Sequence, residues 1–217
     1  MSVDSYSVPD EITSADLVDA MGRMHRHRCH ILDLVSASPG RRLSGLAVTV
    51  SYFPTCSAAL DSGTYNFADL FYEAVGEDSD GKVLVLASNG HPDISLGGGT
   101  KLARVEKMSM AGVLADGRLR DFDELSSYDF ATYCRGEATR WGGDVVTPYQ
   151  ANVPVVVSQV GIHPGDFIYA DSAGAVIVPL SQVDAVLEEA LRVNEEDRGA
   201  IRTIAEESLF GGDRDRR

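Results

Sequence analysis

Residues 97–121 read GGGTKLARVEKMSMAGVLADGRLRD, a glycine run followed by a helical pattern, a short apolar segment and a cluster of charges. The expected helix covers residues 100–110, and the apolar segment 112–115 is typical of a buried strand. Residues 116–121 would then form a polar turn at the carboxyl end of that strand. Ligands of α/β sheets usually bind at this end of a strand. The stretch therefore predicts both an α/β fold and a ligand site.

Apolar patterns on either side of this stretch extend the α/β prediction. Helices are expected at residues 14–22 and 66–75 and in a long acidic segment, with Ser14 and Ser181 as N-caps of the first and last. Strands are expected at 43–53, 83–87, 130–134, 155–159, 167–170 and 175–179. The 217 residues contain no long linker, which favours one domain.

The expected domain covers residues 14–197. Residues 1–13 are expected to be an N-terminal extension, and 198–217 the end of the C-terminal helix with a frayed tail.

Composition limits the classes of partner. The formal net charge is −14, whereas a protein that grips phosphate backbones needs a basic face. We therefore expect no nucleic acid partner. The N-terminus lacks an apolar segment, no run is long enough for a membrane helix, and the three cysteines are far apart. These features predict a cytoplasmic protein without a membrane partner.

The charged side chains of residues 97–121 are candidates for chemistry. Backbone N–H groups at a helix start can bind an anion, and Lys101 and Arg120 could add formal charge. Asp121 could bind Mg²⁺, and Arg120 could hold a carboxylate or stabilise an enolate oxygen. Asp116 is a further candidate carboxylate. The alternatives are a flexible glycine turn and a surface Arg–Asp salt bridge.

Several segments together carry a resemblance that covers most of the chain. They are LVDAMG at 17–22, SGLAVTV at 44–50, GKVLVL at 81–86, GVLADGRLRD at 112–121, CRG at 134–136 and NVPVVVSQVGIHPGDFIYADSAGAVIVP at 152–179. The chain resembles the RraA-like family, which includes regulators of ribonuclease activity and 4-hydroxy-4-methyl-2-oxoglutarate aldolases. The resemblance implies a layered α/β/β/α sandwich of the swivelling β/β/α type. It also implies a homotrimer or a dimer of trimers with sites at subunit interfaces.

The resemblance also implies roles for individual residues. Asp121 would bind Mg²⁺ or Mn²⁺, and Arg120 would bind the substrate. The glycine-rich loop at Gly98, Thr100 and Lys101 would offer backbone N–H groups to the carboxylate of a small anionic 2-oxo acid. A glutamate from the C-terminal helix of a neighbouring subunit would reach the site, and the candidates are Glu195 and Glu196.

One departure from the family pattern concerns metal binding. Members carry G-[DE]-x-L upstream of DGxxRD, and the acidic position falls on Gly99 here. That carboxylate normally holds metal-bound water, so Gly99 would contribute only to the substrate-binding loop. The family segment VLVVDxGG reads VLVLASNG, and His91 and Asp93 just beyond it are candidate replacements. A structural or solvated histidine is the alternative for His91.

The sequence therefore predicts a metal-dependent lyase. It would cleave a 4-hydroxy-2-oxoglutarate-type substrate or decarboxylate an oxaloacetate-like one, in both cases through a pyruvate enolate. The alternatives are a non-catalytic regulator that binds a protein, and an enzyme recruited to another pathway with an altered metal shell and a different substrate. Lys101 could in principle form a Schiff base, although nothing in the sequence shows it desolvated. Trp141 is expected to pack.

Overall fold

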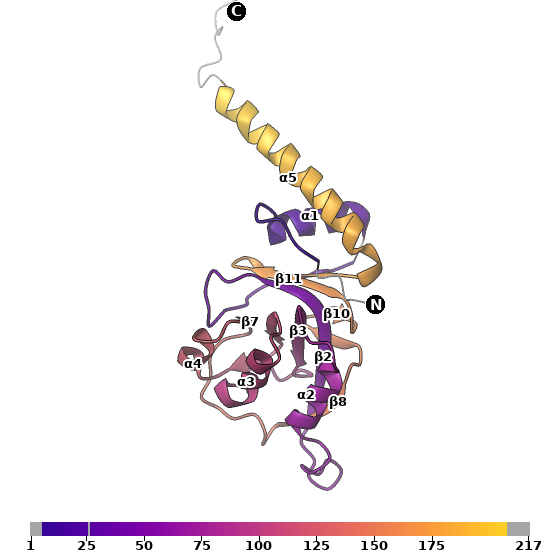
Figure 1. The fold of residues 1–217 in the computed structure, drawn as a ribbon, viewed down its shortest axis with the longest axis vertical. Helices are drawn as coiled ribbons and strands as arrows, with labels where there is room; N and C mark the ends of the chain where they lie inside the picture. The colour runs from indigo at the N-terminus through magenta and orange to yellow at the C-terminus, as the bar shows by residue number, and fades with distance from the viewer. Residues whose placement is uncertain (1–5, 26, 208–217) are drawn as a thin grey trace, which may run out of the picture.

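The computed structural model describes residues 6–25 and 27–207 (Figure 1), in which helices are interspersed with strands as far as α4 and are followed by a run of six strands before the last helix. The helices are α1 (Ser14–Met24), α2 (Phe67–Val75), α3 (Gly99–Lys107), α4 (Phe122–Ser126) and α5 (Val183–Glu206), and the 3-10 turn η1 (Leu180–Gln182) precedes α5. The strands are β1 (His30–Ile31), β2 (Leu43–Pro54), β3 (Lys82–Ala87), β4 (Ser95–Gly97), β5 (Gly112–Ala115), β6 (Arg118–Leu119), β7 (Ala131–Tyr133), β8 (Val146–Ala151), β9 (Val155–Val157), β10 (Val160–Ile162), β11 (Phe167–Asp171) and β12 (Gly174–Val178). The main elements expected from the sequence are therefore present.

One eight-stranded sheet organises the fold, and β2 is its central strand. The strand order is β1-β12-β11-β2-β3-β5-β7, and β8 also pairs with β2. β2, β3, β5 and β7 run parallel, whereas β11 and β8 pair antiparallel with successive parts of β2. β4 with β6, and β9 with β10, form two small separate sheets.

Alternating side chains of β2 face different apolar clusters. Leu46 packs against the cluster beneath α1 and α5, while Val48 on the same face belongs to the cluster beneath α2 and α3. Leu43 and Ala47 point to the opposite face, where residues from both ends of the sheet form a single buried cluster. The sheet therefore folds over this central cluster, with α1 and α5 outside one half and α2 to α4 outside the other (Figure 1). This is the predicted α/β class with its layered arrangement.

The N-cap of α1 differs from the prediction. Thr13 caps the helix, because its Oγ1 accepts the Asp16 N–H at 3.4 Å and the Asp16 carboxylate accepts the Thr13 N–H at 2.8 Å. This reciprocal pair is a capping box. Ser14 instead donates its N–H and hydroxyl to Asp171 of β11, at 2.8 and 2.7 Å. A partner distant in sequence thus decides the role of Ser14.

Two further boundaries differ. Ser181 lies inside η1, and α5 begins after Gln182 without a side-chain cap. The predicted polar turn at 116–121 contains β6, because Arg118 and Leu119 pair with β4. Neither strand could be recognised locally, since each has only two or three residues.

Part of the expected N-terminal extension belongs to the packed structure. Tyr6 and Val8 pack against the cluster beneath α1, and Ile12 is fully buried. The predicted boundary at residue 197 falls inside α5, while the predicted frayed tail at 211–217 lies outside the described residues. Within the described ranges no helix is both long and apolar enough to cross a bilayer.

Gly112 gives a test of the sheet geometry. Its φ is +156°, and a Cβ there would lie 2.1 Å from the Ala131 carbonyl oxygen in β7. We expect Gly112→Ala to destabilise the protein by at least about 1–3 kcal/mol, the usual cost of overpacking. The measurement is urea unfolding. Gly22→Ala in α1 is the control, because a Cβ there meets nothing within 4 Å. It should stabilise by about 0.5–1 kcal/mol, and equal midpoints for the two variants would contradict the packing around β5.

Candidate active site

A small cavity of about 60 Å³ brings together five of the predicted site residues. Its walls are Ser95, Gly97, Gly98, Thr100, Lys101, Arg120, Asp121 and Trp141. The glycine loop and the Arg120–Asp121 pair, which are separated in sequence by α3 and β5, therefore meet as the sequence suggested. The roles of these residues stay predictions.

The pairing of β4 with β6 sets this arrangement. It continues into a hydrogen bond from the Arg120 N–H to the Gly97 carbonyl oxygen at 3.1 Å. The next residue, Asp121, has a φ of 62°, in the left-handed region that few non-glycine residues occupy. Its Oδ2 accepts the Gly99 N–H at 3.1 Å. Asp121 thereby joins the start of α4 to the start of α3.

Glycine is needed at position 98 for this close approach. A Cβ on Gly98 would lie 2.5 Å from Asp121 Oδ2 and 2.6 Å from Arg120 Cγ. Any side chain would therefore push the Arg120–Asp121 pair away from the helix start. The glycine run is part of the site geometry rather than only a flexible turn.

The first turn of α3 offers donors for an anion. The first N–H groups of a helix have no partner inside the helix. The Gly99 N–H is bound by Asp121, which leaves those of Thr100 and Lys101 at the cavity wall. Arg120 adds a formal charge beside them, with Nε 3.6 Å from Asp121 Oδ2. This combination suits a carboxylate.

Lys101 lies in an apolar and positively charged environment. Its Nζ is 5.2 Å from the centre of the Phe67 ring and 3.5 Å from the Leu96 carbonyl oxygen. Burial lowers the pKa of Lys101, and the charges of Arg120 and Arg104 lower it further. Among the described residues no carboxylate forms a salt bridge with this amine. Lys101 is thus partly desolvated, a property that the sequence did not reveal.

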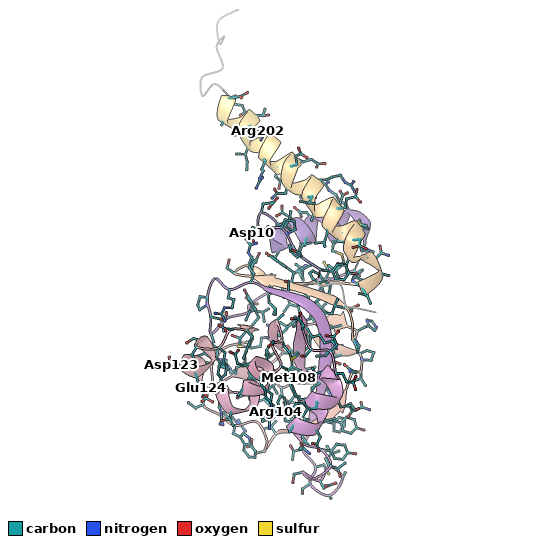
Figure 2. All side chains as sticks on the ribbon, viewed as in Figure 1. Asp10, Arg104, Met108, Asp123, Glu124 and Arg202 are labelled. Carbon is teal, nitrogen blue, oxygen red and sulfur yellow. The ribbon has the colours of Figure 1, made fainter. Side chains whose placement is uncertain are left out.

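Gly99 occupies the position at which the resemblance places an acidic residue. In the structure the carboxylate of Glu124 lies against this glycine. A Cβ on Gly99 would be 1.9 Å from Glu124 Oε2. Figure 2 shows Glu124 on α4, the helix that contacts α3. The Tyr128 hydroxyl lies 3.0 Å from Glu124 Oε1 and 3.3 Å from the Gly99 carbonyl oxygen. Glu124 therefore fills the space that a side chain at position 99 would need.

Asp116 does not face this cavity. Its carboxylate lies 3.4 Å from Arg135 and 3.5 Å from both Ser88 and Ser158, and burial raises its pKa. It lines a separate cavity of about 480 Å³ with Asn89, Gly90, Pro92, Arg135, Val156, Ser158 and Gln159. The structure thus separates Asp116 from Arg120 and Asp121, although all three lie within six residues of sequence.

The other candidate residues lie outside the cavity too. The His91 N–H donates to Ser88 Oγ at 3.2 Å, and Asp93 pairs with Arg118 at 3.4 Å with 86% of its side chain exposed. Glu195 and Glu196 are exposed on α5, and Glu196 pairs with Arg23 of α1 at 2.7 Å. Within one chain, none of these four residues lines the cavity around Arg120.

Sequence reasoning missed Ser95 and Trp141. Trp141 was expected to pack, but it is 60% exposed. It lies at the boundary between the small cavity and a larger one of about 500 Å³, whose walls include Tyr52, Tyr65 and Phe67. No local pattern marked either residue, because both reach the site through pairing around β4.

The donor atoms do not fit a divalent ion held by the protein alone. Asp121 Oδ2 is occupied by the Gly99 N–H and lies near the Arg120 guanidinium, whose charge opposes a cation. Glu124 is turned to Tyr128. In the described part of the chain no three His, Cys, Asp or Glu side chains gather as an ion site. Mg²⁺ can bind through one or two carboxylates when the substrate supplies further oxygens, so Mg²⁺ or Mn²⁺ at Asp121 stays a prediction.

Curated proteins resemble this chain in sequence. A protein of Halalkalibacterium halodurans, provisionally named 4-hydroxy-4-methyl-2-oxoglutarate aldolase, is 29% identical over 134 residues, which cover 62% of this chain and 63% of that protein. A Burkholderia mallei protein with the same provisional name is 31% identical over 153 residues, 68% of this chain and 79% of the relative. With the first relative, the match thus spans less than two thirds of its length.

Solved structures extend the likeness to the whole fold. A Streptomyces coelicolor protein, described as an unusual member of the RNase ES inhibitor RraA family, superposes with a TM-score of 0.76 at 24% identity. The superposition covers 88% of this chain and 93% of that one. The RraA-like family model, described as Aldolase/RraA, matches residues 14–177. The chain therefore belongs to the RraA-like family.

Proposed function

We propose that this protein is a carbon–carbon lyase that acts on a small 2-oxo acid. The reaction is retro-aldol cleavage of a 4-hydroxy-2-oxoglutarate-type substrate or decarboxylation of an oxaloacetate-like one. Both reactions leave a pyruvate carbanion that must be stabilised. The observation that carries the proposal is the meeting of Arg120 with the first turn of α3 in one cavity. The provisional aldolase names of the relatives add support.

The chain's own residues would bind and orient the substrate. The N–H groups of Thr100 and Lys101 and the Arg120 guanidinium would hold the 2-oxo carboxylate. Donors that are fixed before the reaction stabilise developing negative charge without reorganisation. A divalent ion at Asp121, if it binds, would supply Lewis acidity to the 2-oxo group. A water or a nearby carboxylate would take the proton of the C4 hydroxyl.

The large cavity favours one of the alternatives, an enzyme of this fold that acts on a different substrate. It adjoins the small cavity, and its walls combine the aromatic Tyr52, Tyr65, Phe67 and Trp141 with polar side chains, among them Thr55, Ser57, Asp61 and Asn66. Such walls suit an acceptor half that is larger than pyruvate. A recruited enzyme with a different substrate is therefore the second candidate. A non-catalytic regulator is the third, and the absence of an acid at Gly99 favours it.

Arg120 gives the direct test of catalysis. We expect the wild-type protein to release pyruvate from 4-hydroxy-4-methyl-2-oxoglutarate or oxaloacetate. Arg120→Ala should lower kcat/KM by roughly 10- to 150-fold, because it removes a hydrogen bond to the charged substrate carboxylate, worth about 1.5–3 kcal/mol. The matched control is Arg118→Gln, since Arg118 pairs with Asp93 outside the cavity. Pyruvate is measured by a coupled assay. No release by the wild-type protein from either substrate would favour the regulator.

The contact between Gly99 and Glu124 gives a second test. Gly99→Asp should force Glu124 aside and place another negative charge beside Asp121. We expect lower stability and no gain in standard aldolase activity, whereas a supporting carboxylate in a metal site is typically worth about 10–100-fold.

The stability change should depend on Glu124. A double-mutant cycle of Gly99→Asp with Glu124→Ala should give a coupling free energy of about 0.5–3 kcal/mol, at the lower end because Glu124 is exposed and can turn away. Asp123→Ala, next to it on α4, should give no coupling. Additive free energies, or a large gain in aldolase activity from Gly99→Asp alone, would contradict this account.

The exposed end of α5 supports the prediction of a homotrimer or a dimer of trimers. Ile201 and Ile204 are 65% and 61% exposed, and the helix extends beyond the rest of the molecule (Figure 1). A neighbouring subunit that covered this end would also receive Glu195 or Glu196 near its surface. We expect a light-scattering mass of at least three times the 23.3 kDa of the chain. Ile201→Glu with Ile204→Glu should lower it, and a monomer mass for the wild-type protein would rule out the assembly.

A further inference from the structure

Lys101 occupies the boundary between the two cavities of the site. The small cavity contains the donors of the expected carboxylate site, and the large one has aromatic walls. Lys101, Ser95 and Trp141 are the residues that line both. A 2-oxo acid with its carboxylate at Arg120 would therefore place its remaining carbons beside the Lys101 amine.

The surroundings of Lys101 activate an amine. Burial lowers the pKa of the Lys101 amine, and the charges of Arg120 and Arg104 lower it further, while the Phe67 ring lies 5.2 Å from Nζ. A lysine becomes a nucleophile when it is desolvated in an apolar pocket or lies beside other cations. Both conditions hold here. The weak contact with the Leu96 carbonyl oxygen, at 3.5 Å, leaves the amine free to react.

The same helical turn that lacks the acid carries this lysine. In the pattern G-[DE]-x-L the acidic position is Gly99, and the leucine position, two residues on, is Lys101. An apolar residue is thus replaced by an amine where the carboxylate of the metal-binding arrangement is missing. A retro-aldol or decarboxylation reaction needs one electron sink, and an iminium serves as well as a metal ion.

We propose that Lys101 forms a Schiff base with the 2-oxo acid substrate. The step rests on the proposed lyase function. The Lys101 amine attacks the C2 carbonyl, and loss of water gives an iminium. The electrons of the C3–C4 bond move towards the iminium nitrogen, while the C4 hydroxyl loses its proton and becomes the carbonyl of the departing product. The resulting enamine gains a proton at C3. Water then hydrolyses the iminium to release pyruvate and the free amine.

Borohydride trapping with pyruvate tests the proposal. The protein is treated with EDTA, incubated with pyruvate and reduced with sodium borohydride. We expect one carboxyethyl group per chain, located on Lys101 by peptide mass spectrometry. Lys101→Arg should carry none and should lower kcat for pyruvate release by more than about 100-fold. Lys107→Arg, an exposed lysine on the same helix, should behave as the wild-type protein.

The outcomes separate this proposal from the lyase function. Pyruvate release that stops in EDTA, with no adduct on the wild-type protein, overturns the Schiff base and leaves the lyase intact. An adduct on Lys101 without pyruvate release from either substrate supports the Schiff base and counts against the lyase. An adduct that persists in Lys101→Arg, or that is located on Lys82 or Lys107, overturns the assignment. The wild-type peptide alone identifies the residue, so the conclusion does not depend on the folding of a variant.

Discussion

The fold depends on one long strand that serves two layers. β2 pairs with β11 near its start, with β8 near its end and with β3 along its other edge. Its alternate side chains pack against the helix layers on one face and the central cluster on the other, so a shift of one residue would exchange the side chains that the two faces bury. Close approach reinforces this register, because a Cβ on Gly45 would lie 1.9 Å from the Gly81 carbonyl oxygen. β3 pairs in parallel with β2, and β5 pairs in parallel with β3.

The site follows from that placement through a short chain of contacts. β5 leads into β6, β6 pairs with β4, and β4 ends at the glycine run that opens α3. The Asp121 carboxylate accepts the Gly99 N–H, and this hydrogen bond joins the start of α4 to the start of α3. The carboxylate is therefore part of the scaffold, whatever ion or substrate it also contacts. Arg120 adds positive charge beside it, and Arg104 adds a second charge near Lys101, in a protein whose formal net charge is −14. An anionic substrate requires such a local concentration of positive charge.

Two residues on the first turn of α3, Gly99 and Lys101, depart from the G-[DE]-x-L pattern on which the resemblance to the family rests. Gly99 removes a carboxylate and opens space that Glu124 fills. Lys101 places an amine where the pattern has an apolar side chain, and Phe67 covers that amine. The two differences act on the same requirement, because both a metal ion and an iminium stabilise a carbanion next to a carbonyl carbon. In the proposed mechanism the Lys101 amine therefore takes over the stabilisation of the carbanion that a metal ion supported by a carboxylate at position 99 would provide.

The sequence by itself determined what depends on local pattern. Periodicity located the main helices and strands, and the segment ending in Arg120 and Asp121 identified the loop that opposes the glycine run. It also showed that Gly99 lacks the acid. Only the tertiary structure decided which neighbouring charges share a cavity. Asp116 turns away to Arg135, while Phe67 of α2 lies over the Lys101 amine and the charge of Arg120, in the loop after β6, acts on it. Desolvation is a property of packing between distant segments, and no residue pattern along the chain encodes it.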